Sequence, residues 1–192
     1  MPVIEVLTVI HAPRERVFDI ARSIDAHQDS TSGTAERAVA GNINGLIGMG
    51  ESVTWEARHF GIRQQLTVRV TAFEPSRHFQ DRMISGPFKR MVHDHDFADV
   101  PGGTLMHDRF EFESPLGIPG GIVDWLFLAP YLRQFLVHRA EALKLFAESS
   151  RGSRYLGEAG QKRWSAKHPP GGNASRNFAA AFAAVGNTKE TE

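Results

Sequence analysis

The chain has 192 residues, 41% of them hydrophobic, and its 22 Lys and Arg side chains balance 22 Asp and Glu side chains. This length suits one domain with a substantial core. The absence of cysteine excludes a disulfide framework, a thiolate nucleophile and a cysteine-ligated metal centre. Zero net charge argues against a protein dedicated to nucleic acid, which normally carries a basic excess. The balance is uneven, because residues 1–149 are slightly acidic and residues 150–192 are basic.

No targeting or membrane-spanning segment is expected. The first residues, Met1 to Val6, lack the basic region that precedes the apolar stretch of a signal peptide. The most apolar region, residues 118–137, is interrupted by prolines, glycines and charged side chains, so it predicts a buried helix rather than a membrane span. We therefore expect a cytoplasmic protein with no membrane insertion.

In chain order, the pattern predicts a strand over residues 3–10 and then a helix that begins near Pro13. A second short helix is expected near residues 26–29, with Ser23 or Asp25 as its cap. A series of antiparallel strands with short connections follows. The expected strands are 35–40, 51–60, 62–73, 78–84, 88–98 and 104–113.

Apolar side chains at helical spacing predict one long helix from about residue 122 to residue 149. Pro130 lacks an amide hydrogen, so we expect it to kink this helix or divide it. Beyond residue 149 the periodicity is lost and Ser, Gly, Arg and Pro dominate. Residues 150–192 are therefore expected to be a mostly disordered basic tail, with a short helix over residues 178–185.

This order of elements resembles the START-like, or SRPBCC (polyketide cyclase-like), superfamily. Local segments resemble a bacterial subfamily of ligand-binding or cyclase-like SRPBCC proteins over residues 1–149. These segments are GESVTWEARHFG (50–61), FQDRM (79–83), GPF (86–88), HDHDF (93–97) and TLMHD (104–108). The resemblance implies an α+β helix-grip fold, in which a curved antiparallel sheet of six to seven strands wraps a long C-terminal helix and encloses a ligand cavity.

The alternation of side chains along strands predicts which residues face that cavity. In the strand 104–113, Asp108 shares a face with aromatic side chains and should point inward. In the strand 88–98, His93 and His95 share the apolar face, and a hairpin would place them opposite or diagonal to Asp108. The residues expected to contact a ligand are Trp55, His59, Asp81, Met83, Met91, His93, His95, Met106, Asp108, Phe110, Phe127 and Tyr131.

Three interpretations of these polar groups remain open. They can form a structural hydrogen-bond network, orient a polar group on an otherwise apolar ligand, or catalyse proton transfer. In the catalytic case, His93 or His95 is the general base and Asp108 orients it. Two histidines and a carboxylate are also metal-ligand types, but short His-x-His matches are common by chance, so we expect no metal and no cofactor.

The sequence thus favours binding of a small, mostly hydrophobic ligand with a polar group in an internal cavity. One alternative is a cyclase or dehydratase type of enzyme that uses a His–Asp pair for proton transfer. Another is a non-catalytic interaction module. The expected partner is the small molecule, and neither nucleic acid nor a membrane is expected to be one.

Overall fold

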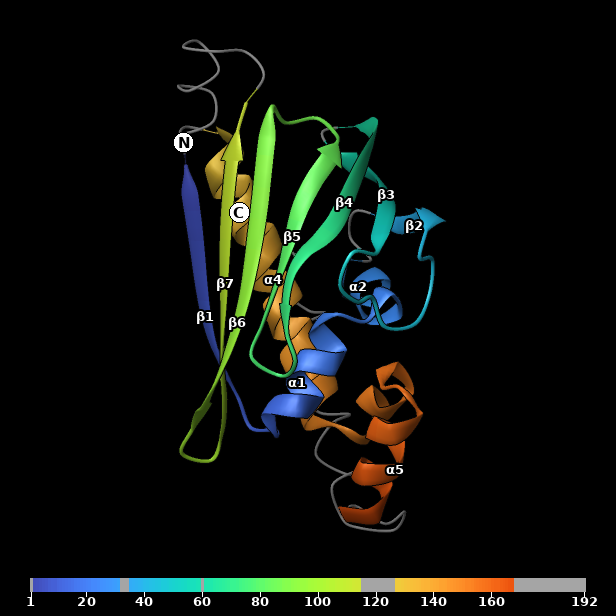
Figure 1. The fold of residues 1–192 in the computed structure, drawn as a ribbon. Helices are drawn as coiled ribbons and strands as arrows, with labels where there is room; N and C mark the ends of the chain where they lie inside the picture. Colours follow the sequence, from blue (N-terminus) through green and yellow to red (C-terminus); the bar gives the residue numbers. More distant parts are fainter. Residues whose placement is uncertain (1, 32–34, 60, 115–126, 168–192) are drawn as a thin grey trace, which may run out of the picture.

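The computed structural model describes residues 2–31, 35–59, 61–114 and 127–167. Its elements follow the predicted order, with boundaries shifted by a few residues (Figure 1). They are β1 (Val3–Ile10), α1 (Arg14–Ala21), α2 (Ile24–Ser30), β2 (Arg37–Gly41), β3 (Ser52–His59), β4 (Ile62–Glu74), β5 (His78–Ser85), β6 (Arg90–Val100), β7 (Gly103–Glu113), α4 (Ala129–Glu148), the 3-10 helix η3 (Ser150–Tyr155) and α5 (Glu158–Lys167).

The described strands form one seven-stranded antiparallel sheet in the order β1-β7-β6-β5-β4-β3-β2. The sheet curves, and α4 runs diagonally across it with α1 and α2 on the same side (Figure 1). This is the α+β arrangement that the sequence predicted, a curved antiparallel sheet wrapped around a long helix.

The period-two alternation places one face of each strand in the core. In β7 every second residue is buried over the whole strand. These residues are Thr104, Met106, Asp108, Phe110 and Phe112. On β6 the buried row contains Met91, His93, His95 and Phe97, and on β3 it contains Val53, Trp55 and Ala57. Because apolar burial drives folding, the aromatic and aliphatic members of these rows fix which face turns inward, and the polar members are carried in with them.

The last long helix departs from the prediction at its start. Within the described residues α4 begins at Ala129, so Pro130 lies in the first turn, where its missing N–H breaks no helical hydrogen bond. The expectation that Pro130 kinks or divides a helix beginning near residue 122 stays a prediction, because residues 115–126 lie outside the described residues. Leu136, Ala140 and Leu143 form its buried stripe. None of the described helices is long and apolar enough to cross a membrane.

The structure corrects the predicted start of the disordered tail. Residues 150–167, expected to lack regular structure, form η3 and α5. Tyr155 and Leu156 are buried against the core, and the Tyr155 hydroxyl donates a 2.6 Å hydrogen bond to Asp29 of α2. These two apolar residues offset the entropy cost of ordering a polar segment. The helix expected over residues 178–185 lies outside the described residues.

A buried arginine joins the first helix to the end of α4. Arg16 Nε donates to the carbonyl oxygen of Ala147 at 2.7 Å, and Nη2 donates to that of Ser149 at 2.6 Å. A helix leaves its last carbonyls without internal partners, and a cation stabilises that end. Burial lowers the pKa of Arg16 to about 10, which leaves the guanidinium charged at neutral pH.

Gly152 lies next to this arginine and has no room for a side chain. A Cβ there would lie 1.9 Å from the carbonyl oxygen of Phe146 and 3.0 Å from Arg16 Nη2. We expect Gly152→Ala to lower the free energy of unfolding by about 1–3 kcal/mol, because the backbone of η3 must move. Gly48→Ala is the control, since its Cβ would meet only Glu51 Oε2 at 3.6 Å. Equal urea midpoints for the two variants would contradict the prediction.

Candidate functional site

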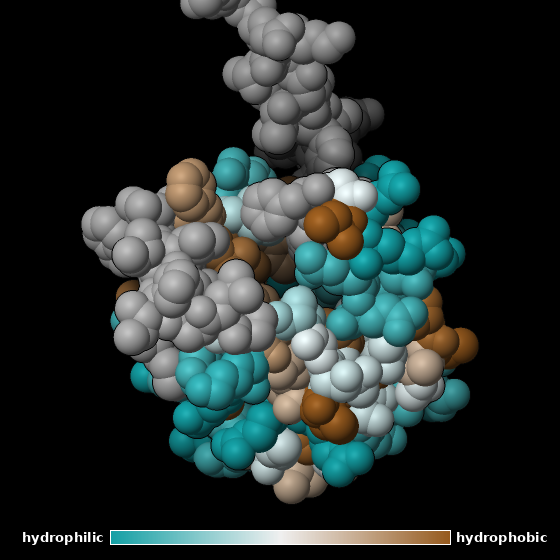
Figure 2. Space-filling model, turned by 90° about the horizontal axis from the view of Figure 1, so that it is seen from above, coloured by the Kyte–Doolittle hydropathy of each residue, from teal (hydrophilic) through white to brown (hydrophobic). Residues whose placement is uncertain are grey.

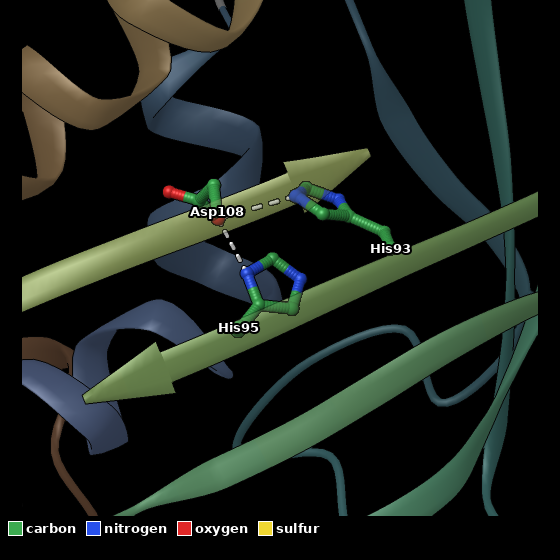
Figure 3. Close-up of side chains that lie close together, drawn as sticks. All are labelled: His93, His95 and Asp108. Carbon is green, nitrogen blue, oxygen red and sulfur yellow. Dashed lines mark hydrogen bonds and ion pairs between the residues drawn. The ribbon is translucent and has the colours of Figure 1, made fainter. Parts of the chain in front are cut away.

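Two histidines and a carboxylate meet on the inner face of the sheet (Figure 3). His95 of β6 pairs in register with Asp108 of β7, and His93 lies two residues earlier on the same face. His95 Nδ1 is 2.6 Å from Asp108 Oδ1, and His93 Nε2 is 3.2 Å from the same oxygen. The antiparallel hairpin therefore produces the juxtaposition that strand alternation predicted.

Two further charged residues complete this group, which we call the histidine cluster (His93, His95, Asp108, Asp81 and Arg139). Asp81 of β5 places Oδ2 3.4 Å from His95 Nε2. Arg139 of α4 places Nη1 3.6 Å from Asp108 Oδ1, and its Nη2 donates to the carbonyl oxygen of Ala21 at 3.2 Å. Asp108 and Arg139 are almost wholly buried, so the cluster links the sheet to the helix that it wraps.

The histidine cluster shifts the pKa values of its two histidines in opposite directions. Burial lowers the pKa of His95, but its contacts with Asp108 and Asp81 outweigh burial and leave that pKa above its ordinary value. His93 behaves in the opposite way, because burial, followed by the charge of His95, lowers its pKa to about 4. His95 therefore holds a proton more tightly than an ordinary histidine does, whereas His93 is neutral at neutral pH and keeps one acceptor nitrogen.

Both carboxylates of the cluster are ionised. Burial raises the pKa of Asp108, but hydrogen bonding to His93 and His95 outweighs burial and holds that pKa well below its usual range. Burial likewise raises the pKa of Asp81, and its contact with His95 reverses the shift. When His95 is protonated, two carboxylates, one imidazolium and one guanidinium sum to zero, and buried charges are stable when they are balanced in this way.

The same three side chains contain the donor atoms of a metal site. One ligand atom from each of His93, His95 and Asp108 lies within 4.8 Å of the others. In this arrangement, however, His95 Nδ1 and Asp108 Oδ1 are hydrogen-bonded to each other at 2.6 Å, and the Arg139 cation lies beside that oxygen. A divalent ion would have to break the hydrogen bond and tolerate the guanidinium, so the geometry favours an ion-pair cluster over a metal centre.

The cluster borders a large cavity between the sheet and α4. The cavity has a volume of about 830 Å³ and is lined mainly by apolar side chains, including Val68 of β4 and Leu132 and Phe135 of α4. Figure 2, a view from above, shows hydrophobic side chains inside a central hollow whose rim is partly hydrophilic. A volume of this size suits a small organic ligand.

The predicted contact residues divide between the cavity and the core. The cavity is lined by Trp55, Asp81, Met91, His93, His95, Phe110, Phe127 and Tyr131. Met106 is fully buried in the core, and Met83 is partly buried and packs against it. These two residues and Asp108 are not part of the cavity lining, so their contact with a ligand stays a prediction. The alternation rule gives the face of a strand but not the depth at which a cavity ends. The side chain of His59 is outside the described residues.

The structure also shows polar cavity residues that the sequence did not reveal. Arg139 lies three residues after Leu136 and four before Leu143, so a charge on the apolar stripe of α4 was a usable signal. His27 of α2 and Glu36, just before β2, form a 3.0 Å contact between Nε2 and Oε2. His27 also stacks on Trp55, with 4.0 Å between ring centroids. No sequence pattern indicated this second pair.

The family model described as "Polyketide cyclase / dehydrase and lipid transport" matches residues 1–148. No curated protein shows significant sequence similarity to the chain.

Several solved structures share the fold. TTHA0849 from Thermus thermophilus is 19% identical, with a TM-score of 0.61, and the match covers 77% of this chain and 100% of that one. The Zhui aromatase/cyclase from Streptomyces sp. R1128 is 17% identical, with a TM-score of 0.57 and coverage of 79% and 98%. Ginseng major latex-like protein 151 from Panax ginseng is 14% identical, with a TM-score of 0.53 and coverage of 77% and 98%. Identities this low establish a common fold and nothing further.

Proposed function

Because the chain belongs to the polyketide cyclase / dehydrase and lipid transport family, we propose that it binds a small, largely hydrophobic molecule whose polar group contacts the histidine cluster. The cavity carries this proposal. It combines an apolar lining with a few convergent polar groups, which is the usual composition of a small-molecule site. His93 offers the ligand an acceptor nitrogen, since burial keeps its pKa at about 4 and its ring neutral.

The electrostatics support binding better than proton transfer. A general base works best when its pKa lies near the working pH, and the pKa of His93, about 4, makes it a weak base. The pKa of His95 is raised, and its ring is held between Asp108 and Asp81. Each of its two ring nitrogens therefore faces a carboxylate of the protein rather than a ligand. The His–Asp pair therefore serves a cyclase mechanism less well than it serves ligand orientation.

A cavity-filling substitution tests the proposal. Val68 is buried and lines the cavity, so Val68→Phe places an aromatic ring in the space that a ligand needs. We expect this variant to bind N-phenyl-1-naphthylamine, an uncharged fluorescent probe, at least tenfold more weakly than the unsubstituted protein, as measured by the fluorescence of the probe. Val9→Phe makes the same chemical change at a half-exposed position on β1 and should leave the affinity unchanged. Unaltered affinity in a folded Val68→Phe variant contradicts the proposal.

Native mass spectrometry of protein purified from its own host identifies the natural ligand. The expected result is a mass increment that disappears on mild denaturation and is absent from Val68→Phe. The same increment on both proteins would place the ligand outside the cavity.

A further inference from the structure

Two groups of polar side chains in the cavity lining come from different elements. One is the part of the histidine cluster that lines the cavity, on β5, β6 and α4. The other is the pair formed by His27 of α2 and Glu36, beside Trp55 of β3. Both belong to a lining that is mainly apolar, with side chains such as Leu66, Val68 and Leu132, and that also contains Arg22, Gln64 and Gln65. A ligand with one polar group can hydrogen-bond at only one of these places. The polar side chains at the other place would then face the apolar part of the ligand.

The separation of the two places follows from the sheet order. Trp55 lies on β3 and His93 lies on β6, three strands away. Neighbouring strands are about 4.8 Å apart, which gives roughly 14 Å along the curved sheet. That span calls for an elongated ligand, longer than a single aromatic ring.

The His27–Glu36 pair has the character of a recognition site for a flat polar group. The Glu36 side chain is 8% exposed and that of His27 is 18% exposed, so both are largely removed from water. The rings of His27 and Trp55 stack at an interplanar angle of 23° and present aromatic surface at this end of the cavity. Tyr131 of α4 also lines it, and burial together with the nearby charge of Glu36 raises the pKa of Tyr131. A hydroxyl group can donate to the carboxylate here while an attached ring packs on the aromatic surface.

The charges at the two places indicate which polar groups the ligand carries. In the histidine cluster the charges of Asp81 and Asp108 are balanced by those of His95 and Arg139, and His93 is neutral. At the other place, a histidine contacts a carboxylate. A free carboxylate on the ligand would lie near Asp81 at one end or near Glu36 at the other, and burial of a charge without an available counter-charge costs several kcal/mol. A hydroxyl group avoids that cost and can donate to an acceptor at either place.

We propose that the cavity binds an elongated molecule that carries no carboxylate and has a hydroxyl group at each end, one end at His93 and the other at the His27–Glu36 pair, with an apolar body between them. This inference rests on the proposed ligand-binding function and adds the length, charge and polarity pattern of the ligand. His93 accepts from one end through its neutral ring, and Glu36 accepts from the other.

Rigid rod-like probes test the inference. Stilbene, para-hydroxystilbene and para,para′-dihydroxystilbene differ only in the number of terminal hydroxyl groups, and their binding is followed by quenching of tryptophan fluorescence. On the unsubstituted protein we expect the second hydroxyl to tighten binding about tenfold, the value of one well-formed hydrogen bond in a buried site. If the unsubstituted protein binds the monohydroxy and dihydroxy probes with equal affinity, that result alone overturns the inference.

Two double variants test whether the gain in affinity from the second hydroxyl group arises at the His27–Glu36 pair. The double variant His27→Phe/Glu36→Leu keeps ring and volume but removes both polar partners, and in it the monohydroxy and dihydroxy probes should bind equally. A matched control is His107→Phe/Glu5→Leu, which removes a 3.5 Å contact between the same residue types on the outer face of the sheet. The tenfold gain should survive in the control. A gain that persists in the folded His27→Phe/Glu36→Leu variant overturns the inference.

The same experiment separates this inference from the proposed function. If none of the three stilbenes binds the unsubstituted protein, the proposed function fails together with the inference. If all three bind with equal affinity and Val68→Phe weakens them all, the binding function stands and the two-ended ligand is rejected.

Discussion

Asp108→Ala is expected to lower the free energy of unfolding by about 3–5 kcal/mol, the usual cost of removing one partner from a buried ion pair. Asp108 Oδ1 contacts His95 at 2.6 Å, His93 at 3.2 Å and Arg139 at 3.6 Å. Without the carboxylate, the Arg139 guanidinium, whose side chain is only 5% exposed, loses its counter-charge. Urea denaturation at neutral pH measures the loss, provided that the slope of the transition is unchanged.

Asp94→Ala is the matched control for this prediction. Asp94 lies on the outer face of β6, where it accepts a 2.7 Å hydrogen bond from Gln80 and stands near Arg109. Since water reaches this face, its loss should cost about 1 kcal/mol or less. An Asp108→Ala variant no less stable than Asp94→Ala would show that the histidine cluster contributes little to the fold.

Acidification is expected to destabilise the protein through His93, by about 3 kcal/mol between pH 6.5 and about pH 4. The pKa of His93 is about 4 in the folded chain, where burial and the charge of His95 lower it, against an ordinary value of 6.5. Between these values the unfolded chain binds a proton that the folded chain does not. Stability from this group is therefore present at neutral pH and is lost as the pH falls.

His95 acts in the opposite direction. Its folded pKa is raised, because the contacts with Asp108 and Asp81 outweigh burial. Its contribution is complete below the unfolded pKa of about 6.5 and is lost as the pH rises through the folded pKa. The two histidines together therefore predict that the free energy of unfolding is largest near pH 6.5. A histidine whose pKa is the same in the folded and unfolded chain would make no such contribution.

Urea denaturation at a series of pH values from about 4.5 to about 8 tests this profile. This range lies above the ordinary pKa values of carboxylates and includes that of histidine. His93→Gln should remove the acid limb, whereas His138→Gln, at an exposed position on α4, should retain it. A free energy of unfolding that stays constant as the pH falls from 6.5, or an acid limb that persists in His93→Gln, would contradict the assignment of the low pKa to His93.

Strand alternation alone predicted the centre of the site. Burial has a period of two along β6 and β7, and the short loop between them fixes their register, so the inward positions of His93, His95 and Asp108 follow from local sequence. The same rule could not separate Met106, fully buried in the core, from Met91, which lines the cavity. That difference depends on how closely the helices approach the sheet, and the sequence of a single strand does not contain this information.

The parts of the site that come from helices were harder to predict. Arg139 stands on the apolar stripe of α4, but its partner is known only once the sheet is assembled against the helix. His27 lies on α2, a helix of seven residues, which is too short for its buried face to be identified from periodicity. Its contact with Glu36 and its stacking on Trp55 depend on where two separate segments meet.

The position of β1 at one edge of the sheet has a consequence for how the chain acquires its structure. β1 precedes β7 by about a hundred residues and pairs with it, with Val3 opposite Glu111, and Arg16 reaches the carbonyls at the end of α4. Domains with such distant pairings fold slowly, because a long loop must close before its contacts form. The partners of β1 and α1 are therefore available only after most of the domain has been translated. The pairing of β1 with β7 and the capping of α4 by Arg16 therefore cannot precede the translation of β7 and α4.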